Sequence, residues 1–236
     1  MPSRKKVIPT PVLSAESRVN ITYPPFPSHF TRTAPLDFRN SYKIWYLYIF
    51  IMLTFLDLPG EIRNQIYHQL LILPDISTPR RLGDPPLYPR LLEVCRMVHE
   101  EGKQILYGSN VFLAHPNLLT GLPRLRLYYD TVRAKPLISL IRRFHIRVRL
   151  DCDPNFSATK AENAFSGVEE LTVEVFQAQY RSSNYKVLKL FEGVRGIQKA
   201  SIYGSVTGFP EYVSWLQDAM MSEKDGVVDG FKAAPE

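Results

Sequence analysis

The sequence predicts a mixed α/β (α+β) protein, in which a compact helical hook is followed by a small array of alternating strands and helices. Two observations predict this class. Apolar residues recur at helical spacing over residues 55–112. Beyond Phe112 the spacing changes to a repeat, and each copy ends in the two-residue alternation of a half-buried strand. A chain of 236 residues suits one such domain, with or without a small appendage.

Two segments precede the hook. Residues 1–40 are rich in Pro, Ser, Thr and Arg without an apolar period, which predicts a disordered tail. The hydrophobic segment 41–56 holds an apolar run of 13 residues, Ile44 to Leu56. As a helix this run would span about 20 Å, whereas a bilayer core is about 30 Å thick, so we do not expect an integral membrane protein. The open alternatives for 44–56 are a buried helix or strand beside the hook, a membrane-associated segment, and an insertion foreign to the native protein.

The hook begins with a predicted helix that starts at Pro59. Proline suits the first turn of a helix, because the N–H group that it lacks would have no partner there. Asp57, just before it, is expected to accept hydrogen bonds from the free N–H groups of that turn. Ile62, Ile66 and Leu70 then recur every four residues and form an apolar stripe.

A second helix is predicted to start near Pro89 and to end at Tyr107-Gly108-Ser109-Asn110, with a left-handed cap at the glycine. Gly102 lies inside this helix and costs roughly 1 kcal/mol relative to alanine. Its presence favours close packing of the two helices at a residue without a side chain. The residues expected on one face of this helix are Leu91, Cys95, Val98, Gly102 and Ile105.

Residues 113–222 contain three copies of one pattern. The equivalent positions Phe144, Leu171 and Ala200 are 27 and 29 residues apart. Connections of this kind place the strands parallel and adjacent. A repeat of this length resembles a leucine-rich-repeat array, although the copies lack its Asn/Cys ladder position. A small open α/β sheet is an equally suitable description.

Helical segments are expected between and after these strands. Residues 158–165 and 185–191 are helix-like stretches between the copies, and a last helix is expected around residues 212–219. Residues 223–236 are charged and rich in glycine, so we expect them to fray.

The net charge of +6 is concentrated in the middle of the chain, where residues 120–150 carry eight basic residues and one acidic residue. Strand alternation places Arg143, Arg147 and Arg149 on one face, together with His145. Such a face is a possible polyanion patch, but no aromatic side chains interleave it, so nucleic acid is an open and not a favoured partner. We favour the alternative of internal ion pairs, with Glu169, Glu170 or Glu174 on the neighbouring strand.

The sequence offers no catalytic constellation. The five histidines and two cysteines lack metal-ligand spacing, and neither a phosphate-binding loop nor a nucleophile turn is present. We therefore expect a non-enzymatic protein without a cofactor or a metal. Two unpaired cysteines also suit an intracellular protein, cytoplasmic or nuclear, with membrane association through 44–56 as the alternative.

The hook resembles the F-box-like domain of a large group of mostly uncharacterised fungal proteins. That group carries Leu-Pro-x-Glu-Ile-Arg-x-x-Ile-Tyr, then Leu-Leu-x-x-Cys-Arg-x-x-x-x-Glu, then Leu-Tyr-Gly-x-Asn-x-Phe. Gly102 departs from it, since the group usually has alanine there. The matching residues are Pro59, Glu61, Ile62, Arg63, Ile66 and Tyr67, then Leu91, Leu92, Cys95, Arg96 and Glu101, then Leu106, Tyr107, Gly108, Asn110 and Phe112.

The resemblance implies a role as substrate adaptor of a cullin–RING ubiquitin ligase, because F-box domains generally bind its Skp-type adaptor. The residues that would contact the adaptor are Leu58, Pro59, Ile62 and Ile66, and the strand array would hold an unknown protein client. The alternative is a structural scaffold or a nucleic-acid-associated protein, in which the hook packs only against the rest of the chain.

Overall fold

The structure is a computed structural model that describes residues 54–74, 76, 86–178, 184–224, 226 and 228–232. The predicted disordered tail 1–40 and the hydrophobic segment up to residue 53 lie outside the described residues. Within the described part of the chain, no helix has the length and apolar character needed to cross a membrane.

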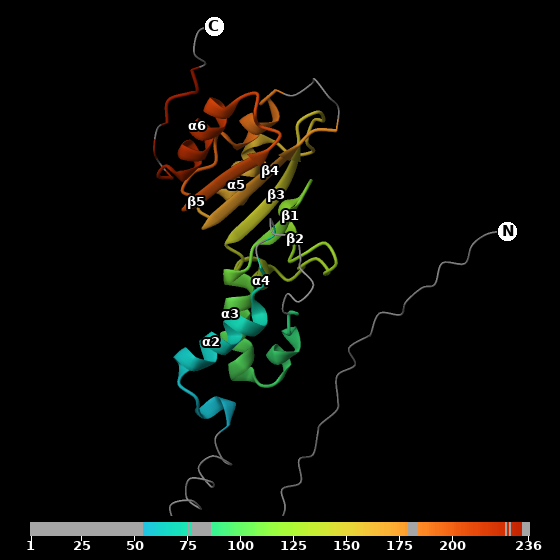
Figure 1. Ribbon diagram of the computed structural model, residues 1–236, viewed down its shortest axis with the longest axis vertical. Helices are drawn as coiled ribbons and strands as arrows, with labels where there is room; N and C mark the ends of the chain where they lie inside the picture. The colour runs from blue at the N-terminus through green and yellow to red at the C-terminus, as the bar shows by residue number, and fades with distance from the viewer. Residues whose placement is uncertain are drawn as a thin grey trace, which may run out of the picture. The chain divides into compact units, whose positions relative to one another are not determined.

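The described chain is a mixed α/β protein with one five-stranded mixed sheet (Figure 1). In chain order its elements are η1 (Phe55–Asp57), α2 (Gly60–Leu71), η2 (Pro89–Glu93), α3 (Arg96–Ser109), β1 (Phe112–His115), β2 (Leu119–Arg124), α4 (Lys135–Ile138), β3 (Arg143–Arg149), α5 (Ala158–Phe165), β4 (Glu170–Phe176), η3 (Val187–Phe191), β5 (Lys199–Gly204) and α6 (Pro210–Met221), where η denotes a 3₁₀ turn.

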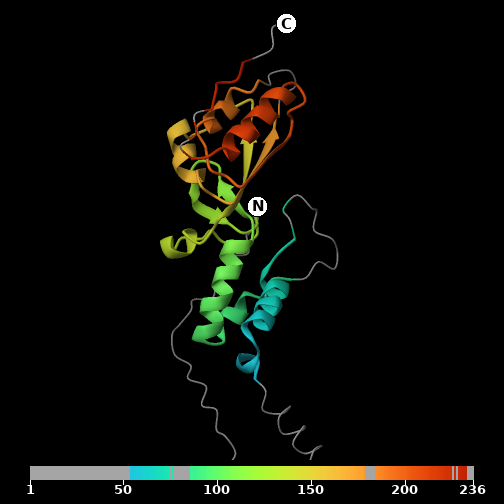
Figure 2. The same ribbon diagram turned by 90° about the vertical axis from the view of Figure 1, so that its left-hand side faces the viewer.

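Helices α2 and α3 form the hook and lie side by side (Figure 2). Tyr67 and Leu71 of α2 are buried, whereas Ile62 at the other edge of the predicted stripe is exposed. Asp57 does not cap α2 as expected. Its carboxylate accepts from the backbone N–H and the hydroxyl of Thr54 at 2.8 and 2.7 Å, and so closes the preceding turn η1 instead.

The second helix of the hook starts later than predicted. Pro89–Glu93 forms the turn η2, Cys95 is extended, and α3 begins at Arg96. The break lets η2 fold back against α3, where Leu92 covers Gly102. A Cβ atom at Gly102 would lie 2.4 Å from Leu92 Cδ2 and 3.2 Å from Leu71 Cδ1, so the expected close packing at this glycine is found.

The strand order in the sheet is β2-β1-β3-β4-β5. Strands β3, β4 and β5 are parallel neighbours, as predicted, and β3 also pairs in parallel with β1. The equivalent repeat positions meet across the strands, because Phe144 pairs with Leu171 and Leu171 with Ala200. The antiparallel hairpin β1–β2 was not predicted.

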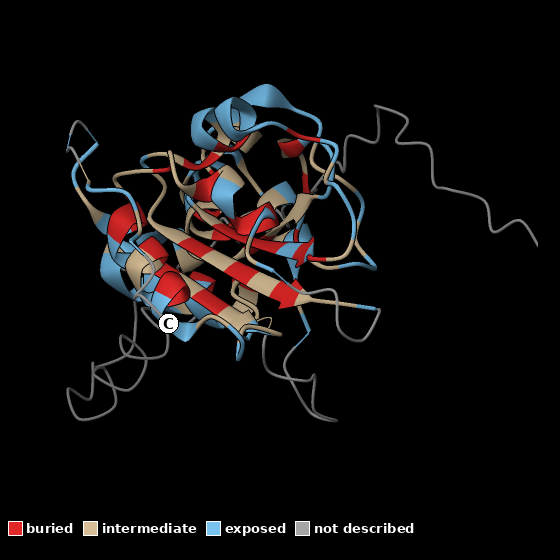
Figure 3. Ribbon diagram, turned by 90° about the horizontal axis from the view of Figure 1, so that it is seen from above, coloured by how far each residue is buried: buried red, intermediate tan, exposed pale blue. Residues whose placement is uncertain are grey.

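One face of the sheet is buried under helices. Phe165 of α5 contacts Phe144 edge to face at 5.9 Å. The stretch 185–191, predicted to be helix-like, contains the 3₁₀ turn η3, and η3 and α6 contribute to the same core. Burial alternates along β4, where every second residue from Leu171 to Val175 is buried and those between are half-buried. This alternation is visible as bands along the strands (Figure 3). Among the described residues, no helical layer covers the opposite face, which is called the open face below.

The sheet ends at β5, on which α6 packs. The side-chain amide of Gln217 in α6 donates to the carbonyl of Ala200 at 3.3 Å. Phe231 lies within the segment 223–236, for which we predicted fraying, yet its ring packs against Tyr212 at 5.2 Å and Trp215 at 5.7 Å. The Trp215 indole also donates to the carbonyl of Asp229 at 3.1 Å, so this part of the tail is held on α6.

Gly204 ends β5 with a φ of +110°, and a Cβ atom there would lie 2.0 Å from the Val175 carbonyl oxygen. We expect Gly204→Ala to lower the free energy of unfolding by at least about 2 kcal/mol, because both the backbone conformation and the contact oppose a side chain. Urea unfolding measures this loss. Gly208→Ala is the matched control, since nothing lies within 4 Å of a Cβ there, and its effect should stay within about 0.5 kcal/mol. Equal effects of the two substitutions would contradict the prediction.

Candidate functional site

The hook is held together by a polar network between its two helices. Arg63 of α2 binds Glu101 of α3 through two nitrogens, at 3.0 and 2.6 Å, and the hydroxyl of Tyr67 donates to the same carboxylate at 2.8 Å. Arg63 also donates to the carbonyl of Leu58 at 2.5 Å and to that of Leu56 at 3.3 Å. One arginine therefore links α2, α3 and the chain around η1.

This network shifts the titration of its members. The hydrogen bonds from Arg63 lower the pKa of Glu101. Burial, with a further contribution from the carboxylate of Glu101, raises the pKa of Tyr67 to about 12. The network thus favours an ionised Glu101 and a neutral Tyr67.

Asn110 joins the ends of the two helices. Its side-chain amide donates to the carbonyl of Leu71 at 2.7 Å and to that of Leu106 at 2.9 Å, and its oxygen accepts from the N–H of Leu73 at 2.8 Å. This buried side chain satisfies helix-end groups that would otherwise lack partners. The predicted left-handed cap at Gly108 is wrong, because α3 continues through that residue to Ser109.

The four residues predicted to contact an adaptor lie at the start and along the outer side of α2. Pro59 is exposed, Ile62 is 41% exposed, and Leu58 and Ile66 are half-buried. Ile62 and Ile66 also line an open hollow along this helix. None of the four is buried, although Tyr67 and Leu71 of the same helix are.

The arginines of the predicted polyanion patch have carboxylates beside them. Arg143 lies 3.5 Å from Glu169, and Arg147 lies 3.1 Å from Glu174, which are two of the three carboxylates that we expected. The third arginine finds a different partner. Arg149 binds Asp151 through two nitrogens, at 2.8 and 2.7 Å, and this contact holds the pKa of the aspartate below its usual range.

His145 shares the face of these arginines, but the structure buries it to 2% exposure. Its Nε2 lies 3.0 Å from Glu174 Oε2, the oxygen that Arg147 also approaches. Its ring meets that of Tyr203, two strands away on β5, at 6.3 Å. Glu174 therefore couples β3 to β4 through two basic side chains on the open face.

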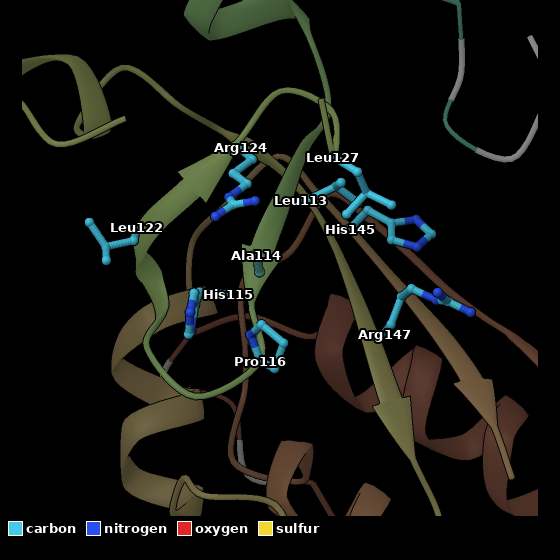
Figure 4. Close-up of a pocket in the computed structure, with 9 residues that line it drawn as sticks. All are labelled: Leu113, Ala114, His115, Pro116, Leu122, Arg124, Leu127, His145 and Arg147. Carbon is cyan, nitrogen blue, oxygen red and sulfur yellow. The ribbon is translucent and has the colours of Figure 1, made fainter. Parts of the chain in front are cut away.

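Two hollows lie on the open face, near the β1–β2 hairpin. The first has a volume of about 270 Å³ and lies over β1, with Arg124 from β2 and Arg147 from β3 on either side (Figure 4). The second has a volume of about 370 Å³ and extends past Phe176 to Phe156. The guanidinium of Arg147 stacks over the Phe176 ring at 5.1 Å. The hollows share Pro116, Leu127 and Arg147 and form one groove, called the hairpin groove below.

Sequence reasoning missed this groove because it missed the hairpin. The four-residue strand β1 and the proline-containing strand β2 carry no sustained alternation, so they lack the signal by which β3 and β4 were found. Within the described ranges, no group of three or more His, Cys, Asp or Glu side chains is arranged to hold a metal. Cys95 and Cys152 are free thiols.

Comparison with known proteins adds no relative: no protein-family model matches the chain, and no curated protein or solved structure matches it either.

Asn110→Ala removes three buried hydrogen bonds at once. We expect it to lower the free energy of unfolding by about 2–4 kcal/mol, since the carbonyls and the N–H that it serves would lose their partners in the interior. Asn117→Ala is the control, because among the described residues the side-chain oxygen of Asn117 accepts one hydrogen bond, from the exposed Asn155 at 3.3 Å. Asn110→Asp keeps the acceptor and loses both donors, so it should not restore stability. Wild-type stability of either Asn110 variant in thermal unfolding would refute the role of this side chain.

Tyr67 makes stability sensitive to alkaline pH. A tyrosine in the unfolded chain ionises near pH 10, whereas the pKa of Tyr67 in the folded chain is about 12. The stability that its neutral hydroxyl contributes is therefore complete below about pH 10 and is lost as the pH rises from about 10 to 12. Tyr67→Phe should flatten this decline in urea unfolding measured from pH 8 upward. Part of the slope should remain, because burial also raises the pKa of Tyr212; an unchanged slope would count against the network.

Proposed function

We propose that this chain is a non-enzymatic, F-box-like protein-interaction module that acts inside the cell as a substrate adaptor of a cullin–RING ubiquitin ligase. In this role the outer side of α2 binds a Skp-type adaptor, and the strand array binds the client. The observation that carries the proposal is that some motif residues make contacts inside the hook and others lie on its surface. Arg63, Glu101 and Asn110 are engaged inside the hook, whereas the apolar members at the start of α2 stay accessible.

The contacts of the hook support the first half of the proposal. Arg63, Tyr67 and Glu101 bind one another, and Asn110 binds the helix ends, so these motif residues have an internal task. Ile62, with 41% exposure, has no such task. Ile62 and Ile66 line the same open hollow along α2, and an exposed apolar surface of this kind suits a protein interface.

The arrangement of the strands supports the second half. In a leucine-rich-repeat-like array, each repeat adds one parallel strand to its neighbour, with helices on one face and a strand surface left for a partner. Strands β3, β4 and β5 follow one another in this way, and their core positions pair in register. We therefore assign the client to the open face.

The contacts of the basic strand favour this role over nucleic-acid binding. Arg147 and Arg149 each have a carboxylate within 3.1 Å. Phosphate groups would have to compete with these carboxylates, so the strand offers less attraction to a polyanion than its sequence suggests.

Ile62→Asp tests the adaptor face. We expect it to abolish co-purification of a Skp-type adaptor and cullin with the tagged full-length chain, because a charge replaces an apolar contact. The unfolding midpoint should change little, since this side chain is already partly in water. Met221→Asp is the matched control, because Met221 is also 41% exposed but lies on α6, and it should leave co-purification intact.

Two results would oppose the proposal. If the wild-type chain retains neither adaptor nor cullin, the hook is a structural element. If Ile62→Asp unfolds the chain, as followed by circular dichroism, Ile62 belongs to the internal packing, and the scaffold alternative is the better description.

A further inference from the structure

We infer that the hairpin groove binds a short extended peptide segment in which a carboxylate side chain neighbours an apolar one. The identification of that segment as part of a client rests on the proposed function. The binding chemistry itself rests on three features of the groove: an exposed apolar side chain, donors of Arg124 and His115 in the first hollow, and a length that fits a few extended residues.

An exposed apolar side chain lies in the groove. Leu127 lines both hollows and is 75% exposed. Leu113, Leu122 and Phe176 add apolar surface to the same two hollows. Burial of Leu127 under a partner would remove its apolar surface from water. The groove therefore offers a site for an apolar side chain.

The first hollow also offers hydrogen-bond donors. Arg124 and Arg147 line it, and no carboxylate lines it among the described residues. Arg124 makes no ion pair within the part of the chain that the structure describes. His115 accepts the N–H groups of Asn117 and Leu118 at its Nδ1, both at 3.1 Å, which leaves its Nε2 as the proton-bearing nitrogen. Arg147 is already paired with Glu174 at 3.1 Å, so the donors open to a ligand among the described residues are the guanidinium of Arg124 and the Nε2 of His115. These donors favour a ligand that brings a carboxylate.

The dimensions of the groove favour a peptide of a few residues. The two hollows run beside β3 from His145 to Arg149, which is roughly 13 Å along a strand. An extended peptide of about four residues covers this distance. Alternate side chains of such a peptide point to the same side, so a carboxylate and an apolar residue near each other in sequence reach neighbouring parts of the groove.

The carboxylates near the second hollow argue against a polyanion as the ligand. Asp153 lines that hollow, and Glu174 and Asp151 lie beside Arg147 and Arg149. A nucleic-acid strand brings a phosphate at every nucleotide and would meet these negative groups. A peptide with a single carboxylate meets the donors of the first hollow and leaves the second to its apolar side chain.

The probe is a mixture of fluorescein-labelled octapeptides in which a single glutamate is followed by leucine, isoleucine or phenylalanine residues on a glycine–serine background. Its binding to the full-length chain is measured by fluorescence polarisation. Two matched mixtures carry lysine in place of glutamate, or alanine in place of the apolar residues. We expect both to bind at least tenfold more weakly than the first, and an eight-nucleotide oligouridylate to bind more weakly than the first mixture.

Substitutions in the hairpin groove test whether the peptides bind there. Arg124→Glu and Leu127→Asp should each weaken binding of the glutamate mixture at least tenfold. Arg133→Glu makes the same charge change at an exposed residue outside both hollows, and Met221→Asp makes the same polarity change on α6. Both controls should bind as the wild-type chain does.

Three outcomes would overturn the inference: no saturable binding of the glutamate mixture, equal binding of the lysine mixture, or unchanged binding by Arg124→Glu and Leu127→Asp. Tighter binding of the oligouridylate would show that the groove serves nucleic acid. Adaptor co-purification is scored separately on the same variants and should be unaffected. If the peptides bind but the adaptor does not co-purify, the proposed function is refuted and the inference about the groove stands. If the adaptor co-purifies but the peptides do not bind, the inference about the groove is refuted and the proposed function stands.

Discussion

Apolar side chains of consecutive parallel strands meet in register on one face of the sheet, and the rest of the molecule is arranged around that layer. Phe144, Leu171 and Ala200 occupy equivalent positions on β3, β4 and β5, and α5 covers them with Phe165. Since strand side chains alternate, burial of this set obliges the intervening residues to face the other way. Basic and acidic side chains of adjacent strands are thereby brought together on the open face, Arg147 with Glu174 and Lys199 with Glu170, instead of forming a uniform basic surface.

In the hook, polar side chains join the two helices, and apolar side chains on the outer side of α2 remain exposed or half-buried. Tyr67 and Leu71 are the buried residues of α2, and directional contacts between the helices lie beside them. Glu101 receives both Arg63 and Tyr67, and Asn110 serves two carbonyls and one N–H at the helix ends. These motif residues therefore account for how the hook folds, and the choice of partner depends on other side chains.

The strands that carry a strong period were predictable, and the features that depend on contacts between distant segments were not. The spacing of Phe144, Leu171 and Ala200 predicted their parallel neighbours, and residues 158–165 coincide with α5. The hairpin β1–β2 has too few alternating residues to stand out. The break before Arg96 was also missed, because it depends on Leu92 folding back onto Gly102, a contact that has no signature in local spacing. Among the candidate site residues, sequence alternation gave the face of each arginine, while the identity of its partner required the register of β3 and β4 and the loop after β3.

The hydrogen bond from Gln217 to the carbonyl of Ala200 lies on β5, the last strand of the array. In parallel pairing, alternate residues direct both backbone groups to the same neighbour, and Lys199 uses its N–H toward β4, so Ala200 presents its groups at the outer edge. A bare edge of this kind is a template on which another chain can add a strand, which is a route to aggregation. The Gln217 amide already occupies the Ala200 carbonyl. One acceptor of this edge is therefore capped by a side chain of the last helix, which hinders the addition of another strand at that point.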